Sequence, residues 1–438
     1  MRDVEGVIAR MGGHGHGVLD HDGERFYVPF TVPGDRIAAR VGEARGDGFA
    51  AQLVVLEEAG PDRVEPPCPH FQACGGCALQ HWADAPYRAW KRDALVAALQ
   101  RRGFAAPPVA DLVTVPDHSR RRAEFIARRV KAGVLMGFHE AASRKIVDLE
   151  ACNVLRPALL ALLPALRGML LDVLGDGWAV DVKVTETETG PDVLITGKLK
   201  MRVQERIALS RAAKAAGLGR LSWRFDPRSD PEMLFQGPQA PLVRFGGTAV
   251  TLAPGGFLQA TAEAEAAMAD LALDALQDAK RVADLFSGCG AFALRLAVAG
   301  KTVLAADADR PAIAALQAAA KAAPGLAGRV TAEMRDLERQ PLTRAEFRKL
   351  DAILLDPPRA GAKAQVQQLA EAAAAGPGGV AAGAAAVPPL VVMAACDANS
   401  FARDARVLAD AGWRLERVTP IDQFRWSPHL EMLGIFRR

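Results

Sequence analysis

The sequence predicts an α/β protein whose C-terminal part forms a mostly parallel, doubly wound sheet, preceded by an α+β region and a small β-barrel. Three observations support this fold class. Short β-prone runs separated by turns fill residues 1–57, clustered cysteines and basic residues mark residues 58–255, and apolar strands alternate with helices over residues 256–438. A chain of 438 residues is too long for one compact domain, and we therefore expect three units with these boundaries.

The N-terminal region contains short strand-forming runs, for example at residues 26–28, separated by turn pairs such as Gly12-Gly13 and Asp22-Gly23. A five-strand barrel of the OB type closes such a chain without leaving exposed strand edges. A small β appendage without a ligand would show the same pattern, so that alternative stays open.

The middle region opens with a proline-rich linker at residues 61–69. A helical stretch follows near residues 86–102, and strand candidates such as residues 192–196 come later. This mixture of elements predicts an α+β unit.

After about residue 256 the pattern changes to a regular alternation of strands and helices. A strand at residues 281–286 ends in a glycine-rich turn, a helix follows at residues 291–299, and the next strand begins at residue 302. This order predicts parallel strands joined by helices. The Ala/Gly-rich stretch at residues 372–386 is low in complexity and predicts a loose helix end and a loop.

Composition is ordinary for a globular protein, because 50% of the residues are apolar and 24% are charged. The net charge of +3 does not by itself indicate a nucleic-acid partner. The N-terminus does not read as a signal peptide, and no stretch reaches the roughly 20 uninterrupted apolar residues of a membrane span. We therefore expect a cytoplasmic, monomeric protein without a membrane partner.

A ligand site is predicted at the turn from Asp284 to Gly290, which joins a strand to a helix where open α/β sheets bind their ligands. Asp307 ends the following strand about 20 residues later, where a carboxylate can accept hydrogen bonds from ribose hydroxyls. The turn lacks a complete G-x-G-x-x-G motif and a Walker lysine. Together with Asp356 and the two prolines after it, these features favour S-adenosylmethionine over a nucleotide.

Cys396 directly follows a predicted strand at residues 391–395, which places it on the same edge of the sheet as Asp356. A lone cysteine is more often a small buried apolar side chain than a nucleophile. The position beside a cofactor site nevertheless makes Cys396 a candidate nucleophile, since a thiolate is reactive near neutral pH and leaves readily.

Three of the six cysteines, Cys68, Cys74 and Cys77, cluster near the start of the middle region. In a large intracellular chain such clustering indicates metal ligands rather than disulfides. The spacing Cys-x5-Cys-x2-Cys suits zinc or an iron–sulfur cluster and differs from the Cys-x3-Cys-x2-Cys of radical enzymes. Spacing alone leaves both kinds of site open.

Five arginines crowd one predicted strand, namely Arg120, Arg121, Arg122, Arg128 and Arg129. Alternation along a strand would place part of this charge on one face, where RNA phosphates can be held. A solvated basic strand is the simpler alternative.

In their order along the chain, these motifs resemble those of the RNA uridine-C5 methyltransferase family, and the match spans nearly the whole chain. Residues 6–34 are similar to the TRAM domain, an OB-like RNA-binding module. Ala395-Cys396-Asp397 resembles the family's Ser-Cys-Asn nucleophile motif, and His429-Leu430-Glu431 resembles the His-Val-Glu motif of its base.

The resemblance also implies two sets of ligand-binding residues. The first binds S-adenosylmethionine and comprises Gln259, Phe286, Asp307, Asp336 and Asp356. The second holds a [4Fe–4S] cluster and comprises Cys68, Cys74, Cys77 and Cys152. The fold that the resemblance implies for the C-terminal part is a Rossmann-like methyltransferase domain.

Six positions depart from the family's pattern, and two of them are Ser287 and Cys289, which stand where a cysteine and a small aliphatic residue are usual. Ala291 stands where an asparagine helps to bind the cofactor, and Asp307 stands where a glutamate is usual. Ala395 and Asp397 replace the usual serine and asparagine beside the nucleophile. A negative charge at Asp397 would raise the pKa of the neighbouring thiol unless its carboxylate points away.

The reaction that the resemblance implies is methyl transfer from S-adenosylmethionine to carbon 5 of a uridine. This carbon is a poor nucleophile until a thiolate, here that of Cys396, adds to carbon 6 and converts the ring into an enolate. Glu431 would then remove the carbon 5 proton, so that the thiolate can leave.

A TRAM-like module together with a cysteine cluster favours ribosomal RNA as the partner, and we expect 23S rRNA. Three alternatives stay open. They are uridine methylation of tRNA, cytosine-C5 methylation, and a non-catalytic iron–sulfur RNA-binding protein with a degenerate methyltransferase domain.

Overall fold

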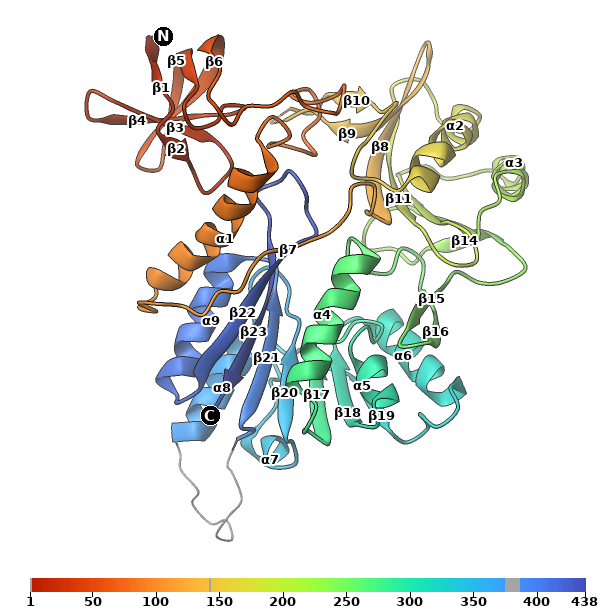
Figure 1. Ribbon diagram of the computed structural model, residues 1–438. Coiled ribbons are helices and arrows are strands. Elements are labelled where there is room, and N and C mark those ends of the chain that lie inside the picture. Colours follow the sequence, from red (N-terminus) through yellow and green to blue (C-terminus); the bar gives the residue numbers. More distant parts are fainter. Residues whose placement is uncertain (1, 142, 375–386) are drawn as a thin grey trace.

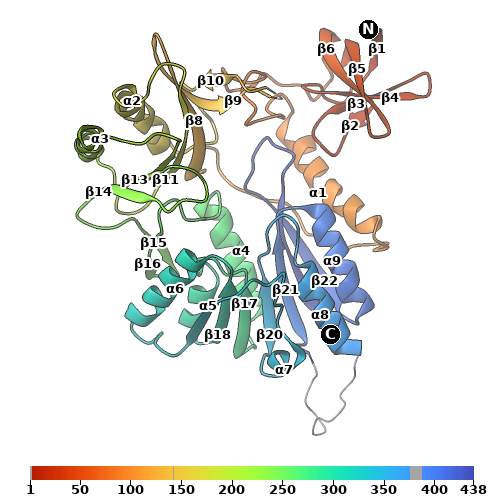
Figure 2. The same ribbon diagram turned by 180° about the vertical axis from the view of Figure 1, so that it is seen from behind.

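The computed structural model describes residues 2–141, 143–374 and 387–438, which divide into three units (Figure 1). The N-terminal β unit and the central α+β unit stand above the C-terminal α/β unit, and helix α1 runs down from the first unit along the last (Figures 1 and 2). None of the helices within these ranges combines the length and the apolar character of a membrane span.

The N-terminal unit is a six-stranded sheet with the order β1-β5-β6-β4-β3-β2. Its strands are β1 (Asp3–Val7), β2 (Arg10–Met11), β3 (Gly17–His21), β4 (Glu24–Val28), β5 (Arg36–Arg45) and β6 (Gly48–Glu58). The backbone N–H of Ala9 donates to the carbonyl of Val18 at 2.9 Å, which links the segment after β1 to β3. The sheet encloses one core that contains Ile8, Phe26 and Ile37. Five strands were expected, and the additional strand is the two-residue β2, which is too short for a sequence pattern to indicate.

The central unit is a seven-stranded sheet with the order β10-β9-β8-β11-β12-β13-β14, and helices α2 (Pro157–Leu171) and α3 (Val203–Ala215) pack on one face. Its strands are β8 (Arg122–Val130), β9 (Gly133–His139), β10 (Ile146–Asp148), β11 (Ala179–Thr185), β12 (Asp192–Thr196), β13 (Arg220–Arg224) and β14 (Glu232–Gln236). Alternation along β8 buries Phe125 and Ala127 against the helices, whereas Arg128 is exposed on the opposite face. A hairpin of β15 (Leu242–Phe245) and β16 (Thr248–Thr251) follows.

The C-terminal unit is an eight-stranded sheet with the order β19-β18-β17-β20-β21-β23-β22-β7, covered by helices on both faces. Strands β17 to β21 are parallel, whereas β23 pairs antiparallel with β21 and β22. The strands are β17 (Arg281–Leu285), β18 (Thr302–Asp307), β19 (Val330–Met334), β20 (Ala352–Leu355), β21 (Leu390–Ala395), β22 (Arg414–Asp422) and β23 (Glu431–Arg437). The helices are α4 (Ala262–Ala275), α5 (Ala293–Val298), α6 (Arg310–Ala322), α7 (Arg344–Phe347), α8 (Lys363–Ala374) and α9 (Ala398–Asp410). The predicted doubly wound α/β fold is confirmed, and of the stretch expected to be a loose helix end and loop, residues 375–386 lie outside the described residues.

Two segments that the sequence pattern groups with the middle region pack against the C-terminal unit instead. Helix α1 (Asp84–Gln100) lies against α9 and contributes Leu95 and Leu99 to the core there. Strand β7 (Val113–Thr114) pairs in parallel with β22. The sequence of a helix or of a two-residue strand does not indicate which sheet it will pack against. The positions of α1 and β7 therefore depend on tertiary packing.

Candidate functional site

The glycine-rich turn after β17 has an unusual backbone. Phe286, Gly288 and Gly290 have positive φ angles of 64°, 52° and 96°. A Cβ at Gly290 would lie 2.5 Å from Cδ1 of Leu316 in α6, so the helix packs this closely only against a glycine. The N–H of Gly288 donates to Oδ2 of Asp307 at 2.9 Å, which joins the turn to the end of β18.

The remaining predicted cofactor residues lie along the same edge of the sheet. Asp336 follows β19, is exposed, and accepts hydrogen bonds from the N–H groups of Glu338 and Arg339 at 3.1 and 3.3 Å. Asp356 follows β20, and its Oδ2 accepts a hydrogen bond from the side chain of Gln259 at 3.3 Å. The fold thus gathers acidic side chains from the ends of β18, β19 and β20 at one edge of the sheet.

Cys396 and Glu431 lie on adjacent strands. Ala395 at the end of β21 is opposite Met432 in β23, so the next step of this antiparallel register brings Cys396 opposite Glu431. Glu431 is buried, and Cys396 is partly exposed. The structure therefore brings together the nucleophile and the base that were predicted 35 residues apart in sequence.

Asp397, the unusual residue beside Cys396, is the N-cap of α9. Its carboxylate accepts hydrogen bonds from the N–H groups of Asn399 and Ser400 at 3.0 and 2.9 Å. A side-chain oxygen at this position satisfies backbone donors that the helix leaves unpaired. The acid thus has a structural partner of its own, and Arg359 lies 3.7 Å from its carboxylate.

A chain of hydrogen bonds links Glu431, which is buried, to Asp356, which is partly buried. The side-chain N–H2 of Gln423 donates to Oε1 of Glu431 at 2.8 Å and to Oε1 of Gln259 at 2.9 Å. Gln259 in turn donates to Asp356, and the carbonyl oxygen of Gln423 accepts from the N–H of Ala260 at 3.0 Å. Gln423 is itself buried, and both polar atoms of its side chain form hydrogen bonds. It therefore holds the carboxylate of Glu431 in one orientation.

Three groups at this edge, Glu431, Asp356 and Cys396, hold their protons more tightly than usual. Burial raises the pKa of Glu431 to about 8, and the neighbouring carboxyl of Asp356 adds to this shift. Burial raises the pKa of Asp356 itself to about 7. The pKa of the Cys396 thiol rises to about 11 through burial, then through Glu431 and Asp356, while Asp397 contributes less. A cationic ligand beside these groups would offset the shifts.

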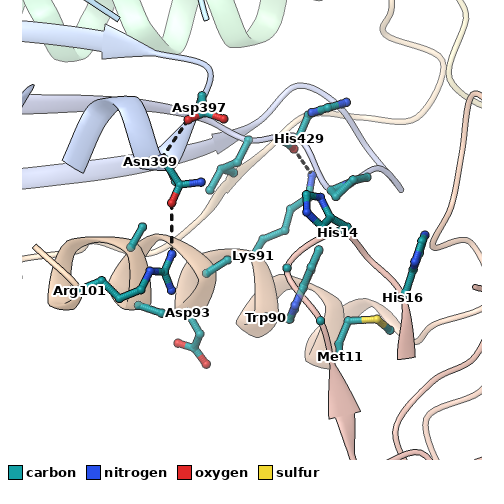
Figure 3. Close-up of a pocket in the computed structure, with 18 of the residues that line it drawn as sticks. Met11, His14, His16, Trp90, Lys91, Asp93, Arg101, Asp397, Asn399 and His429 are labelled. Carbon is teal, nitrogen blue, oxygen red and sulfur yellow. Dashed lines mark hydrogen bonds between the residues drawn. The ribbon is translucent and has the colours of Figure 1, made fainter. Parts of the chain in front are cut away.

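The loop between β22 and Glu431 is fastened to α1. Asp422 is fully buried, forms an ion pair with Lys91 and accepts a hydrogen bond from the Tyr87 hydroxyl at 2.6 Å. The Lys91 ammonium also donates to the carbonyl of His429 at 2.8 Å (Figure 3). The buried cluster therefore ties the start of β23, where Glu431 lies, to a helix from the first quarter of the chain.

An open cleft of about 650 Å³ lies beside Cys396. The N-terminal unit supplies His14, α1 supplies Trp90 and Arg101, and the start of α9 supplies Asn399 (Figure 3). Arg101 donates to Oδ1 of Asn399 at 3.2 Å across the cleft. Walls from separate units and mixed aromatic and basic lining suit a large polyanionic ligand.

Besides Arg120, which donates to the carbonyl of Arg122 at 3.1 Å, two of the five predicted phosphate-binding arginines have partners within the protein. Arg121 is buried in an ion pair with Glu265 at 2.5 Å and donates to the carbonyl of Gln259 at 3.2 Å. Arg129 bonds to the carbonyls of Val130 and Gly133. A phosphate-binding role does not fit Arg121, because binding an RNA phosphate would leave Glu265 buried with one arginine fewer.

The other three arginines line the face of β8 that lacks helices or lie just before it. The guanidinium of Arg122 stacks over the ring of Phe257 at 4.5 Å, and burial lowers the pKa of Arg122 to about 10. Arg120 is partly buried near Cys152, and burial lowers its pKa as well. Arg128 is exposed at the far end of the strand.

The four cysteines predicted to bind a cluster line one small cavity, together with Phe138 and other residues; they are Cys68, Cys74, Cys77 and Cys152. Burial raises the pKa of the Cys77 thiol to about 12, with further increments from the neighbouring thiols. Within the described residues, no group of three or more His, Cys, Asp or Glu side chains is arranged to hold a metal ion. The donor chemistry fits a thiolate-bound metal, whereas the spacing of the thiols is not that of a formed site.

The loop that contains Cys68, Cys74 and Cys77, here called the cysteine loop, also contacts the loop that leads to Glu431. The N–H groups of Ala78 and Leu79 donate to the carbonyl of Trp426 at 2.7 and 3.0 Å. The loop before β23 is therefore held by α1 on one side and by the cysteine loop on the other.

Sequence reasoning missed Gln423, Lys91 and Asp422. Gln423 and Asp422 offered no signal, because the strand before them, Arg414–Asp422, mixes charged and apolar residues and its polar end does not stand out. Lys91 offered none, because it lies on a helix with many charged residues and its partner is more than 300 residues away.

Known proteins resemble this chain over its whole length. Residues 249–438 match the model of the tRNA (uracil-5-)-methyltransferase family. An uncharacterized RNA methyltransferase of Brucella suis is 41% identical, covering 99% of this chain and 97% of its own. A 23S rRNA (uracil(1939)-C(5))-methyltransferase of Pectobacterium atrosepticum is 30% identical, covering 98% and 92%.

A solved structure shares the fold. The Pyrococcus abyssi tRNA (uracil-54, C5)-methyltransferase in complex with S-adenosyl-L-homocysteine superposes with a TM-score of 0.73 at 20% identity, covering 99% of each chain. At this identity the likeness supports the fold of all three units.

Proposed function

The chain belongs to the RNA uridine-C5 methyltransferases, which use S-adenosylmethionine, and we propose that it methylates carbon 5 of a uridine in 23S rRNA with Cys396 as nucleophile and Glu431 as base. One observation carries the proposal. The β21–β23 register sets Cys396 opposite Glu431 at the sheet edge where the acids of the predicted cofactor site gather.

The proposed reaction begins with covalent addition to the uracil ring and ends with release of the thiolate. The Cys396 thiolate adds to carbon 6, and the resulting enolate attacks the methyl group of the sulfonium with carbon 5. S-adenosylhomocysteine leaves with the electron pair of the broken carbon–sulfur bond. Glu431 takes the carbon 5 proton, the carbon 5–carbon 6 double bond forms again, and the thiolate is expelled.

The chain's own residues prepare this site. Gln423 orients the Glu431 carboxylate, and Gln259 connects it to Asp356. Asp356 and Glu431 favour a cationic cofactor, because a positive sulfonium nearby would stabilise their ionised forms. Their raised pKa values would then fall. We propose cofactor contacts for Gln259, Phe286, Asp307, Asp336 and Asp356.

The choice of 23S rRNA rests on the name of the Pectobacterium relative. The cleft between the N-terminal unit and Cys396 supports an RNA that is gripped by more than one unit. We propose that the N-terminal unit contributes to RNA binding as a TRAM domain, and that Arg122 and Arg128 contact the RNA on the open face of β8.

We further propose that the cysteine-lined cavity holds a [4Fe–4S] cluster. The support is the chemistry of four thiols around one cavity, given by Cys68, Cys74, Cys77 and Cys152. The loop contact at Trp426 makes a structural role the natural one.

The test uses RNA that contains 5-fluorouridine. The full-length protein is incubated with cofactor and either 23S rRNA or tRNA transcribed with 5-fluorouridine. Because fluorine cannot leave as a proton, the covalent intermediate is trapped, and we expect a denaturant-stable adduct with 23S rRNA. Cys396→Ala should abolish the adduct, whereas the control Ser210→Ala, on helix α3 of the central unit, should keep it.

The outcomes separate the candidate functions. Mass spectrometry of nucleosides from unfluorinated 23S rRNA should show 5-methyluridine, and 5-methylcytidine would overturn the proposal. An adduct with tRNA alone would assign the tRNA activity. A protein that binds RNA and forms no adduct with any cellular RNA would be the non-catalytic alternative.

A further inference from the structure

The helix-free face of the central sheet is only partly covered. Strands β8, β11, β12 and β13 present polar side chains there, and the segment before α4 crosses the part nearest the catalytic edge. Lys183 donates to the carbonyl of Gly255 at 2.6 Å, and the N–H of Gly255 donates to Asp192 at 3.0 Å. These bonds hold the covering segment in place and leave the far part of the face open.

The open part is a groove of about 490 Å³ flanked by two aromatic side chains. Trp178 is 45% exposed and Phe225 is 40% exposed, an unusual degree for such large rings. The floor between them is made by the ends of β11 and β12, including Ala179 and Thr196. The rings are therefore separate platforms and not one apolar patch.

Positive charge surrounds the groove. Arg128, Arg144 and Lys198 line it, all three are exposed, and none has an ion-pair partner among the described residues. The groove also holds two acids. Asp226 accepts hydrogen bonds from the N–H groups of Arg228 and Ser229 in its own turn, whereas no described residue donates a hydrogen bond to the carboxylate of Asp181.

We propose that this groove binds a single-stranded segment of the RNA substrate, with bases stacked on Trp178 and Phe225 and phosphates held by Arg128, Arg144 and Lys198. Alternating aromatic and basic side chains on an open sheet face is the arrangement that stacks unpaired bases. Unpaired cations around separated rings favour a polyanion over a protein surface, which would meet a continuous apolar core.

The position of the groove makes it a second contact, separate from the catalytic cleft. Arg122 and Arg128 lie at the two ends of β8, and six residues of strand span about 20 Å. Arg122 stacks on Phe257, next to the predicted cofactor segment, whereas Arg128 is at the groove. The inference rests on the proposed function, because it assigns this surface to the same RNA, upstream or downstream of the modified uridine.

The test measures binding of fluorescein-labelled oligouridylates of 5 and 20 nucleotides to the full-length protein. The longer probe can occupy the groove and the cleft together. Trp178→Ala and Phe225→Ala should each weaken binding of the 20-nucleotide probe about tenfold, as expected for loss of one stacked base. Arg128→Ala should weaken binding and reduce the slope of log affinity against log salt by about one.

Two further variants serve as controls for the loss of the aromatic ring and for the loss of a surface charge. Trp178→Phe keeps a ring and should retain most of the affinity. Arg211→Ala removes an exposed arginine from α3, on the opposite face of the sheet, and should leave binding and its salt slope unchanged.

Wild-type affinity and salt slope in Trp178→Ala and Arg128→Ala would overturn the inference, even if the protein methylates RNA normally. Altered sedimentation of these variants without altered RNA affinity would assign the groove to a protein contact and also overturn it. A wild type that binds the probes through the groove and forms no adduct would instead count against the proposed catalytic function.

Discussion

Cysteine thiols with proposed roles lie in two regions of the molecule, and the side chains around the thiols differ between these regions. At the sheet edge that carries the proposed catalytic pair, the Cys396 thiol lies between carboxyl groups of the two strands that flank β21, those of Asp356 after β20 and Glu431 in β23. In the cysteine-lined cavity the neighbours of Cys77 are other thiols. Burial raises the pKa of both thiols, to about 11 and about 12.

The comparison teaches that burial alone does not define the chemistry of a cysteine. A thiol opposite a base that is fixed by hydrogen bonds suits addition to a ring followed by proton removal. Thiols that lie close to one another raise each other's pKa. A bound metal ion would deprotonate all of these thiols together.

Glu431→Gln should reduce the turnover to released 5-methyluridine by about 10²–10⁴-fold, because the carbon 5 proton would have no base after the methyl group has been transferred. The covalent adduct should still form, and with ordinary RNA it should accumulate. Denaturing gel electrophoresis with radiolabelled cofactor measures both quantities. Glu371→Gln on the exposed face of α8 is the matched control and should behave as wild type. An equally slow variant without an accumulated adduct would show that Glu431 acts before the methyl transfer.

The same variant should alter how stability depends on pH. The pKa of Glu431 is raised from 4.5 to about 8, so the native state binds this proton more tightly than the unfolded chain. That contribution is full below pH 4.5 and is lost as pH rises through 8. Between pH 6 and 9 the free energy of unfolding should therefore fall less in Glu431→Gln than in wild type, as measured by urea titration.

Cys77→Ala should lower metal affinity at least about 100-fold, since even indirect supports of a metal ligand cost 10–100-fold. Iron and sulfide are measured after anaerobic purification, together with zinc. Cys289→Ala is the control with the same chemical change outside the cavity. Equal metal content in both variants, or zinc in place of iron, would refute the proposed cluster.

Gln423→Leu should slow methyl transfer about tenfold at neutral pH, because the Glu431 carboxylate loses the donor that orients it. This hydrogen bond lowers the pKa of Glu431, so its loss raises that pKa and shifts the rise in rate to higher pH. A rate profile from pH 6 to 10 measures the shift. Gln367→Leu, exposed on α8, should not shift the profile. A uniform loss of rate at every pH would indicate a merely structural role.

Asp397 should give the smallest effects and separate a cap from a charge. Asp397→Ala removes the N-cap of α9 and should cost about 1 kcal/mol of unfolding free energy. Asp397→Asn keeps a capping oxygen but removes the charge that raises the Cys396 pKa, so the rate at pH 7 should rise slightly with stability unchanged. Equal destabilisation by both substitutions would contradict the capping role.

Features encoded by neighbouring residues were predictable from the sequence. The turn at Asp284 and the strand before Cys396 depend on local apolar runs and glycines, and the structure contains both. The pairing of Cys396 with Glu431 came from a family resemblance, because no local pattern specifies which strands become neighbours. Arg121 shows the limit, since its basic stretch suggested a solvent-facing charge and its partner Glu265 lies on a helix 144 residues later.

The placement of α1 and β7 has a consequence for the order in which the protein is completed. During synthesis these two segments emerge roughly 300 residues before β22, the strand that β7 pairs with, and N-terminal units otherwise fold as they appear. Until then, Leu95, Leu99 and the ammonium of Lys91 lack the surfaces that bury them. Strands β22 and β23 thus complete the surface that buries one of the earliest helices of the chain, and a fragment beginning at residue 249 would lack that helix altogether.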